Sequence, residues 1–89
     1  MYIYKITNTI NNKAYIGQTT GTVQARWSRH KNDALSNRLD THFARALRKY
    51  PIESFIVETI DSAQSQEELT EKEHYWILHY NSVNNGYNE

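Results

Sequence analysis

The first eighteen residues constrain the fold of this chain more than any other stretch. Two runs rich in β-branched and aromatic residues, YIYKITN at 2–8 and KAYIGQ at 13–18, flank an Asn-rich connection. Two such runs separated by a short segment of turn-forming residues are typical of a β-hairpin. We therefore expect the chain to be built on an N-terminal pair of antiparallel strands.

The length of the connection predicts how the two strands pair. With a loop of residues 9–12, Tyr4 lies opposite Gly17 and Ile6 lies opposite Tyr15. Tyr4 and Tyr15 then share one face of the sheet as diagonal neighbours. Gly17 leaves a gap opposite Tyr4, where a side chain would otherwise stand. Two phenols beside a gap are either ordinary core aromatics or the floor of a site that admits a bulky ligand.

The rest of the chain predicts helices and one further strand. The segments in order are a helix at 23–33 with a Thr22 cap, a polar link at 34–38, a second helix from Asp40 or Thr41 to Pro51, a strand at 55–60, and a third helix at about 66–80 after a Ser65–Glu68 capping box. The expected fold class is α+β. A small, three-stranded, mostly antiparallel sheet is flanked by about three helices, in a single domain covering residues 1–89.

The composition excludes some classes of site and indicates where in the cell this domain is expected. The chain has no cysteine, which excludes disulfides and thiolate metal sites. No apolar run approaches the ~18 residues of a membrane-spanning helix. The N-terminus enters a strand directly, without the charged and then apolar leader of a secreted protein. We expect an intracellular protein, in the cytoplasm or nucleoid, with no membrane partner.

The charges are balanced in number but divided along the chain. Residues 1–49 carry nine Lys or Arg against two Asp, a net +7, whereas residues 50–89 carry one Lys against eight acids, a net −7. This division predicts a basic surface able to meet phosphate groups, unless folding mixes the two halves in space.

Glu73 is the residue that fits its surroundings least. It lies four residues after Leu69 and four before Ile77, within the apolar stripe of the third helix. A buried carboxylate is costly unless it is paired or binds a metal. Three interpretations stay open: Glu73 lies at the rim in water, pairs with a buried Arg such as Arg26, or binds a divalent cation in a cleft.

Arg26 and His30 are four residues apart, so they project from one helix face. A guanidinium matches the charge and geometry of a phosphodiester, and an imidazole moves protons near neutral pH. The alternative is a solvated pair on a helix surface. Tyr4 and Tyr15 become useful as bases only beside a cation, because a phenol has a pKa near ~10.

Taken in order, these residues give the chain a resemblance to the GIY-YIG nuclease domain over essentially its whole length. The matching features are Tyr2-Ile3-Tyr4 at the first motif, Tyr15-Ile16-Gly17 at the second, Arg26 and His30 as its Arg-x-x-x-His helix, His42 at a position that is often histidine in homing-type members, Glu73 as its metal-binding glutamate, and Asn88 as the last residue of its closing motif. The first motif departs from the family pattern, since Tyr2 stands where glycine is expected.

The resemblance implies a chemistry for each of these residues. It implies that one divalent metal, Mg²⁺ or Mn²⁺, takes Glu73 as its only protein carboxylate during hydrolysis of a DNA phosphodiester. Arg26 then binds the phosphate oxygens, and either Tyr4 or His30 takes the proton of the attacking water. The remaining roles are positioning ones, held by Tyr15 and Asn88 for the phosphate and water, and by Gly17, which keeps the floor of the site open.

The resemblance also bears on partners. With no net positive charge, the domain is expected to bind DNA weakly and with little sequence preference. Homing-type relatives carry a DNA-binding region after the nuclease domain, and this chain has one residue after Asn88. We therefore expect a monomeric catalytic unit whose specificity comes from another domain or a partner protein. The alternatives are a non-catalytic nucleic-acid-binding module and a plain interaction domain.

Overall fold

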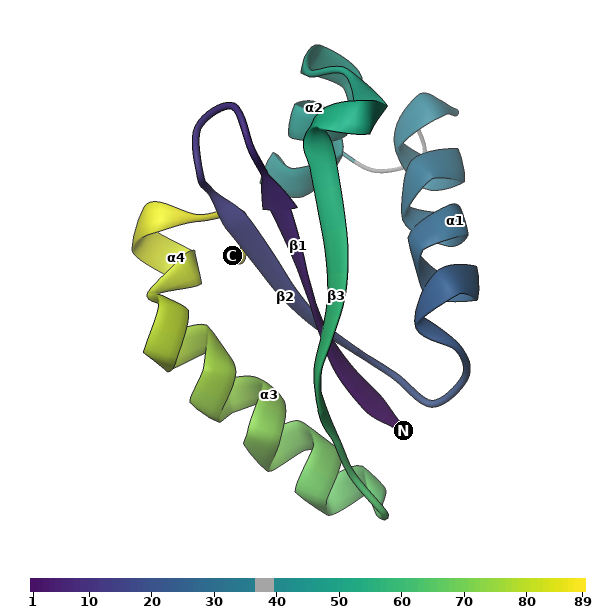
Figure 1. Cartoon of the computed structure of the whole chain (residues 1–89), viewed down its shortest axis with the longest axis vertical. Helices are drawn as coiled ribbons and strands as arrows, with labels where there is room; N and C mark the ends of the chain where they lie inside the picture. The colour runs from purple at the N-terminus through teal and green to yellow at the C-terminus, as the bar shows by residue number, and fades with distance from the viewer. Residues whose placement is uncertain (37–39) are drawn as a thin grey trace.

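The computed structural model describes residues 1–36 and 40–89. Its centre is a three-stranded sheet formed by β1 (Tyr2–Asn8), β2 (Ala14–Thr19) and β3 (Phe55–Ser62). The strand order is β2-β1-β3, and both pairings are antiparallel (Figure 1). The predicted α+β class is confirmed, and β2 is one of the two edge strands.

The hairpin pairs as its loop length predicts. Tyr4 lies opposite Gly17 and Ile6 lies opposite Tyr15. The turn is closed by a hydrogen bond from the Asn12 amide to the Asn8 carbonyl, at 2.8 Å. Asn12 adopts a left-handed conformation with φ of 61°, which asparagine tolerates better than most residues. The Asn-rich connection therefore fixes the register that places the tyrosines.

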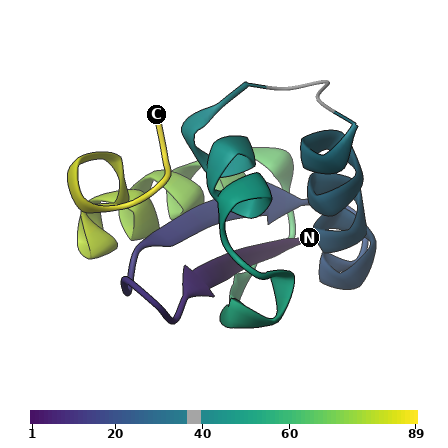
Figure 2. The same ribbon diagram turned by 90° about the horizontal axis from the view of Figure 1, so that it is seen from above.

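Helices cover both faces of this sheet (Figures 1 and 2). On one face lie α1 (Val23–Leu35) and α2 (His42–Lys49), and on the other lies α3 (Gln66–Tyr80). The side chains of Thr22, Thr41 and Ser65 cap these three helices by accepting backbone N–H bonds. None of the helices described is long and apolar enough to cross a bilayer.

The alternation of side chains along β1 divides the core into two layers. Tyr4 and Ile6 face α1 and α2, in a cluster that includes Trp27, Phe43, Leu47 and Phe55. Ile3 faces the other way and packs with Ile16 of β2 and Leu69 of α3. Tyr4 therefore belongs to one layer, whereas the helix that carries Glu73 belongs to the other.

Two predicted segments need correction. Helix α1 continues to Leu35, so Ala34 does not begin a polar link; it is fully buried, seven residues after Trp27 on the same helix face. Residues 37 and 38 of the predicted link lie outside the described part of the chain. The short helix α4 (Ser82–Asn85) and a 3₁₀ turn (Ile52–Ser54) have no counterpart in the prediction, because a single turn leaves no periodic signal.

The C-terminal tail lies along the outer edge of β2. The Tyr87 amide donates to the Ala14 carbonyl at 2.9 Å. The Asn88 side chain accepts from the Ile16 amide and donates to the Ile16 carbonyl, both at 2.8 Å. A Cβ at Gly86 would lie 2.3 Å from the Ala14 carbonyl oxygen, so this approach requires glycine. The tail thus satisfies backbone groups that an edge strand would otherwise expose.

The sequence predicted an open space above Gly17, and this prediction is wrong. The ring of Tyr4 lies across it, and a Cβ at residue 17 would be 2.3 Å from the Tyr4 hydroxyl oxygen. Tyr4 is only 1% exposed, so its ring has no free path to move aside. Gly17 makes room for the catalytic candidate itself.

We predict that Gly17→Ala lowers the free energy of unfolding by about 1–3 kcal/mol, the usual cost of overpacking a core. Gly21→Ala is the matched control, because its Cβ would meet nothing closer than 4.0 Å, and it should change stability by less than about 0.5 kcal/mol. Urea denaturation measures both. Equal stability of the two variants would contradict this account of Gly17.

Candidate active site

Tyr4, Tyr15, Arg26, His30 and Glu73 converge where the two layers meet, around the outer edge of β2. Tyr4 and Tyr15 project toward the layer of α1 and α2, and α1 supplies Arg26 and His30. Glu73 comes from α3, on the opposite layer, and reaches the same edge through Gln18 of β2. An edge strand allows this meeting, because no further strand separates the two helical layers there.

The aromatic part of the site is tightly built. The Tyr4 hydroxyl lies 2.7 Å from His30 Nε2, a hydrogen bond. The Tyr4 and Tyr15 rings are 6.3 Å apart, and the His30 ring is 5.3 Å from that of Tyr15. Phe43 of α2 stacks on Tyr15 at 4.4 Å with the planes almost parallel. These contacts leave the two phenols and the imidazole little freedom to turn.

Burial sets the protonation of these groups. It raises the pKa of Tyr4 well above the ordinary phenol value, reinforced by Tyr15 and opposed by the nearby Arg26 guanidinium. Burial likewise raises the pKa of Tyr15. Burial and the charge of Arg26 lower the pKa of His30 from 6.5 to about 4. At neutral pH the site therefore holds a neutral imidazole beside two protonated phenols.

Arg26 and Glu73 carry the charges of the site but do not bind each other. Neither takes part in an ion pair within residues 1–36 and 40–89. Of the three interpretations left open for Glu73, the one in which it pairs with Arg26 is therefore wrong. The half-buried Glu73 has one polar contact in that part of the chain, Gln18 Nε2 at 3.4 Å. Burial raises the pKa of Glu73, and its charge is close enough to raise those of Tyr4 and Tyr15.

Two cavities adjoin this set and share Arg26 in their walls. The first, of about 260 Å³, is lined by Tyr15, Arg26, His30, Thr41, Phe43, Tyr87, Asn88 and Glu89. The second, of about 330 Å³, is lined by Gln18, Thr19, Thr20, Arg26, Arg29, Gln66 and Leu69. Arg26 thus lines both the aromatic cavity and the one beside the Gln18–Glu73 contact, which suits it to an anion that spans both.

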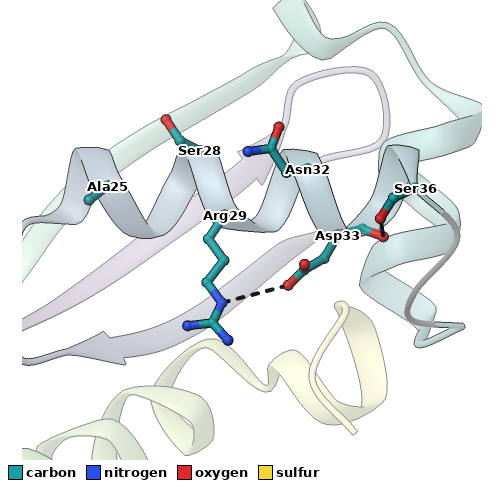
Figure 3. Close-up of a pocket in the computed structure, with 6 residues that line it drawn as sticks. All are labelled: Ala25, Ser28, Arg29, Asn32, Asp33 and Ser36. Atoms are coloured by element: carbon teal, nitrogen blue, oxygen red, sulfur yellow. Dashed lines mark hydrogen bonds and ion pairs between the residues drawn. The ribbon is translucent and has the colours of Figure 1, made fainter.

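A larger cavity, of about 510 Å³, runs along the outer side of α1 (Figure 3). It is lined by Ala25, Ser28, Arg29, Asn32, Asp33 and Ser36. Arg29 and Asp33 form an ion pair there at 3.8 Å, and neither phenol contributes to the wall. Size therefore does not identify the functional site in this protein.

Comparison with known proteins decides the family. Residues 1–88 match the sequence pattern of the GIY-YIG catalytic domain. The chain belongs to the GIY-YIG catalytic domain family. It is 35% identical over 89 residues to intron-associated endonuclease 1 of Enterobacteria phage T4, covering 97% of this chain and 35% of that protein. It is also 34% identical over 92 residues to the uncharacterized protein 019R of invertebrate iridescent virus 6, covering 99% of this chain and 33% of that protein.

Solved structures agree with this assignment. The catalytic domain of intron endonuclease I-TevI, in a glutamate-to-alanine mutant, superposes with a TM-score of 0.88 at 31% identity, covering 97% of this chain and 89% of that one. A second structure of the catalytic domain of homing endonuclease I-TevI gives a TM-score of 0.86 at 30% identity. The chain spans about a third of the length of the curated relatives quoted above.

Not every residue predicted for this GIY-YIG site is drawn into it. His42 lines a neighbouring cavity and packs edge-on against Tyr87 at 5.1 Å. Asn88 lines the aromatic cavity, but its amide is engaged with the backbone of Ile16. Conversely, sequence reasoning missed Gln18, although it directly follows Gly17 and its side chain faces the layer of α3.

The neutral state of His30 predicts a pH dependence of stability. Between pH 6.5 and about 4 the unfolded chain binds a proton at this imidazole that the folded chain does not, so the free energy of unfolding falls as the pH drops. His30→Gln should flatten that fall, as judged by urea denaturation across this range. The raised pKa of Glu73 acts in the opposite direction but is common to both proteins. Identical slopes would contradict the assigned pKa of His30.

Proposed function

We propose that this chain is the catalytic domain of a divalent-metal-dependent DNA endonuclease or nickase. The supporting observation is the pair of half-buried, opposite charges at Arg26 and Glu73, which face the same two phenols without forming an ion pair. A cationic and an anionic side chain that do not pair with each other can bind a ligand that carries both a negative and a positive group. A phosphodiester together with a cation is such a ligand.

The residues at Glu73 fit a magnesium or manganese ion. No group of three or more His, Cys, Asp or Glu converges in the described part of the chain. Within residues 1–36 and 40–89, the carboxylate of Glu73 has one polar contact, the Gln18 amide at 3.4 Å. Mg²⁺ usually keeps several waters and accepts one or two carboxylates, so Glu73 would hold it as a single protein ligand. When bound, the ion neutralises charge on the phosphate and on the leaving oxygen.

Arg26 is the group we assign to the phosphate. Its guanidinium lies in the walls of both cavities and is not occupied by a carboxylate of the described chain. A planar guanidinium donates two parallel hydrogen bonds to phosphate oxygens. In the half-buried site these bonds stabilise the additional negative charge of the transition state more strongly than they would in water.

Tyr4 and His30 are assigned as one proton-accepting unit. Tyr4 on its own is protonated, because burial raises its pKa, whereas His30 is neutral and lies 2.7 Å from the phenol oxygen. As the attacking water gives its proton to the Tyr4 oxygen, the phenol proton passes to His30 Nε2. The sequence left the base as either residue; the hydrogen bond favours both acting together.

The other predicted site residues are proposed to position this machinery. Tyr15, held against Phe43 and close to His30, orients the phosphate and water. Asn88 holds the β2 edge at Ile16, next to Tyr15, and Gly17 seats the Tyr4 ring. We assign His42 to the adjoining surface, because it lines a different cavity.

The wider biology is proposed on the same basis. We infer that residues 1–89 act as a single, monomeric catalytic domain on intracellular DNA. The net charge of zero predicts weak binding of DNA by this domain alone. A relative with this catalytic domain is an intron-associated endonuclease about three times as long, which supports sequence specificity supplied by another domain or a partner.

Glu73→Gln is expected to lower metal-dependent nicking of supercoiled plasmid by about 10²–10³-fold, the effect of removing one charge-stabilising group. The substitution preserves shape, so thermal unfolding should remain similar to that of the native chain. Glu71→Gln is the matched control, since Glu71 is an exposed acid on the same helix, and it should nick normally. Equal activity of the two variants would remove Glu73 from the mechanism. Salt-sensitive DNA binding by a native chain that never nicks would indicate a binding module instead.

Tyr4→Phe and His30→Gln test the proton-accepting unit. Each substitution should reduce the nicking rate by about 10²–10⁴-fold, as expected for loss of a general base. Because the two groups act on one proton path, the double variant should be no slower than the slower single variant. Single-turnover nicking rates measure this. Effects that multiply would show that the two residues act independently.

A further inference from the structure

Basic residues that the proposed mechanism does not use gather on one side of α2. His42, Arg45 and Lys49 are spaced at i, i+3 and i+7, which places them along one helix face. Phe43 and Leu47 are buried in the core on the other side. Helix α2 therefore packs its apolar side against the core and carries its basic side chains on the opposite side.

This basic face forms one wall of a fourth cavity, of about 300 Å³. The lining comes from the β1–β2 loop, from α2 and from two tyrosines, and consists of Asn11, Lys13, His42, Arg45, Ala46, Lys49, Tyr50 and Tyr87. No acidic side chain is in that lining. Lys13, Arg45 and Lys49 are exposed, so the cavity opens to solvent as a groove with three cationic groups.

These cations are available to a ligand. Lys13 and Lys49 form no ion pair in residues 1–36 and 40–89. The Lys49 ammonium lies 5.4 Å from the centre of the Tyr50 ring, an interaction that leaves its charge uncompensated. Arg45 pairs with Asp40 at 3.5 Å, but both side chains are more than half exposed. Such surface pairs contribute little and exchange readily.

The groove adjoins the candidate active site through one shared wall residue. Tyr87 lines both this groove and the aromatic cavity that holds Arg26 and His30. One strand of duplex DNA carries a phosphate for every ~3.4 Å of helix axis. A strand with one phosphate at Arg26 must therefore lay its neighbouring phosphates on the adjoining surface, and this groove is a cationic part of that surface.

We propose that Lys13, Arg45 and Lys49 form a track for the DNA phosphates next to the scissile one, an inference that rests on the proposed function. Contacts of this kind fix the position of the duplex without reading its bases. The track accounts for how a domain without net positive charge holds its substrate: the cations are concentrated on the side where the strand passes.

Salt titration of DNA binding tests this track. The probe is a labelled DNA duplex two helical turns long. The full chain that binds it carries Glu73→Gln, so that the DNA is not cleaved during the titration. In that background, adding Lys13→Gln and Lys49→Gln removes two phosphate contacts. The slope of log K against log salt should then become shallower by about 1.8, since each contact contributes about 0.9, and the affinity should fall.

Lys5→Gln with Lys72→Gln is the matched control. It removes the same charge from the side of the molecule near α3, where Lys5 lies 4.3 Å from the Tyr80 ring and Lys72 pairs with Asp61. This control should keep the parent slope, with thermal unfolding confirming that all variants fold. The proposed track would be wrong if the salt slope of the Lys13 and Lys49 variant were unchanged, or if the control showed the same reduction in slope.

Plasmid nicking by the chain with Glu73 intact separates this inference from the proposed function. If that chain nicks but the slope is unchanged, the track is wrong and the nuclease assignment stands. If it never nicks but the slope becomes shallower only in the Lys13 and Lys49 variant, the nuclease assignment fails while the cationic groove remains a phosphate-binding surface.

Discussion

The packing of the Tyr4 ring on the backbone of Gly17 determines the geometry on which the rest of the site depends. Because residue 17 has no Cβ, the Tyr4 ring can lie against its backbone, and the Tyr4 hydroxyl hydrogen-bonds His30 at 2.7 Å. The same contact buries the phenol, and burial is the main cause of its raised pKa. Position and protonation state of the proposed base thus have a single structural origin.

The position of β2 at the edge of the sheet is the second requirement. In a sheet covered by helices on both faces, residues of the two layers are normally kept apart by the strands between them. Here Arg26 from one layer and Glu73 from the other act on the same two phenols, because they meet around an edge. The tail covers that edge at Ala14 and Ile16, which protects it from pairing with another strand.

Local rules predicted much of this fold. The four-residue loop set the register of Tyr4 and Gly17, and short polar side chains marked the starts of three helices. Features that depend on packing between distant segments were not predictable in this way. Ala34 extends α1 because a neighbouring layer buries it.

The candidate site divides along the same line. The spacing of Arg26 and His30 on one helix face, and the misfit of Glu73 in an apolar stripe, were visible in the sequence. Glu73 contacts Gln18 and does not pair with Arg26 because of how α3 packs at the edge of the sheet. No local sequence pattern contains that packing. The engagement of Asn88 with Ile16 is likewise a contact across 72 residues.

The long-range contacts of the C-terminal tail also affect how the protein folds during its synthesis. The Asn8 amide bonds to the Tyr87 hydroxyl across 79 positions, so the first strand and the closing segment belong to one cooperative unit. Contacts of such long range slow folding, because loop-closure entropy is lost before they form, and during synthesis they must wait until residues 87 and 88 have left the ribosome. A nascent chain therefore carries the two phenols and Arg26 before the tail contacts with β2 have formed, and the candidate site is complete only after this whole domain has been synthesised.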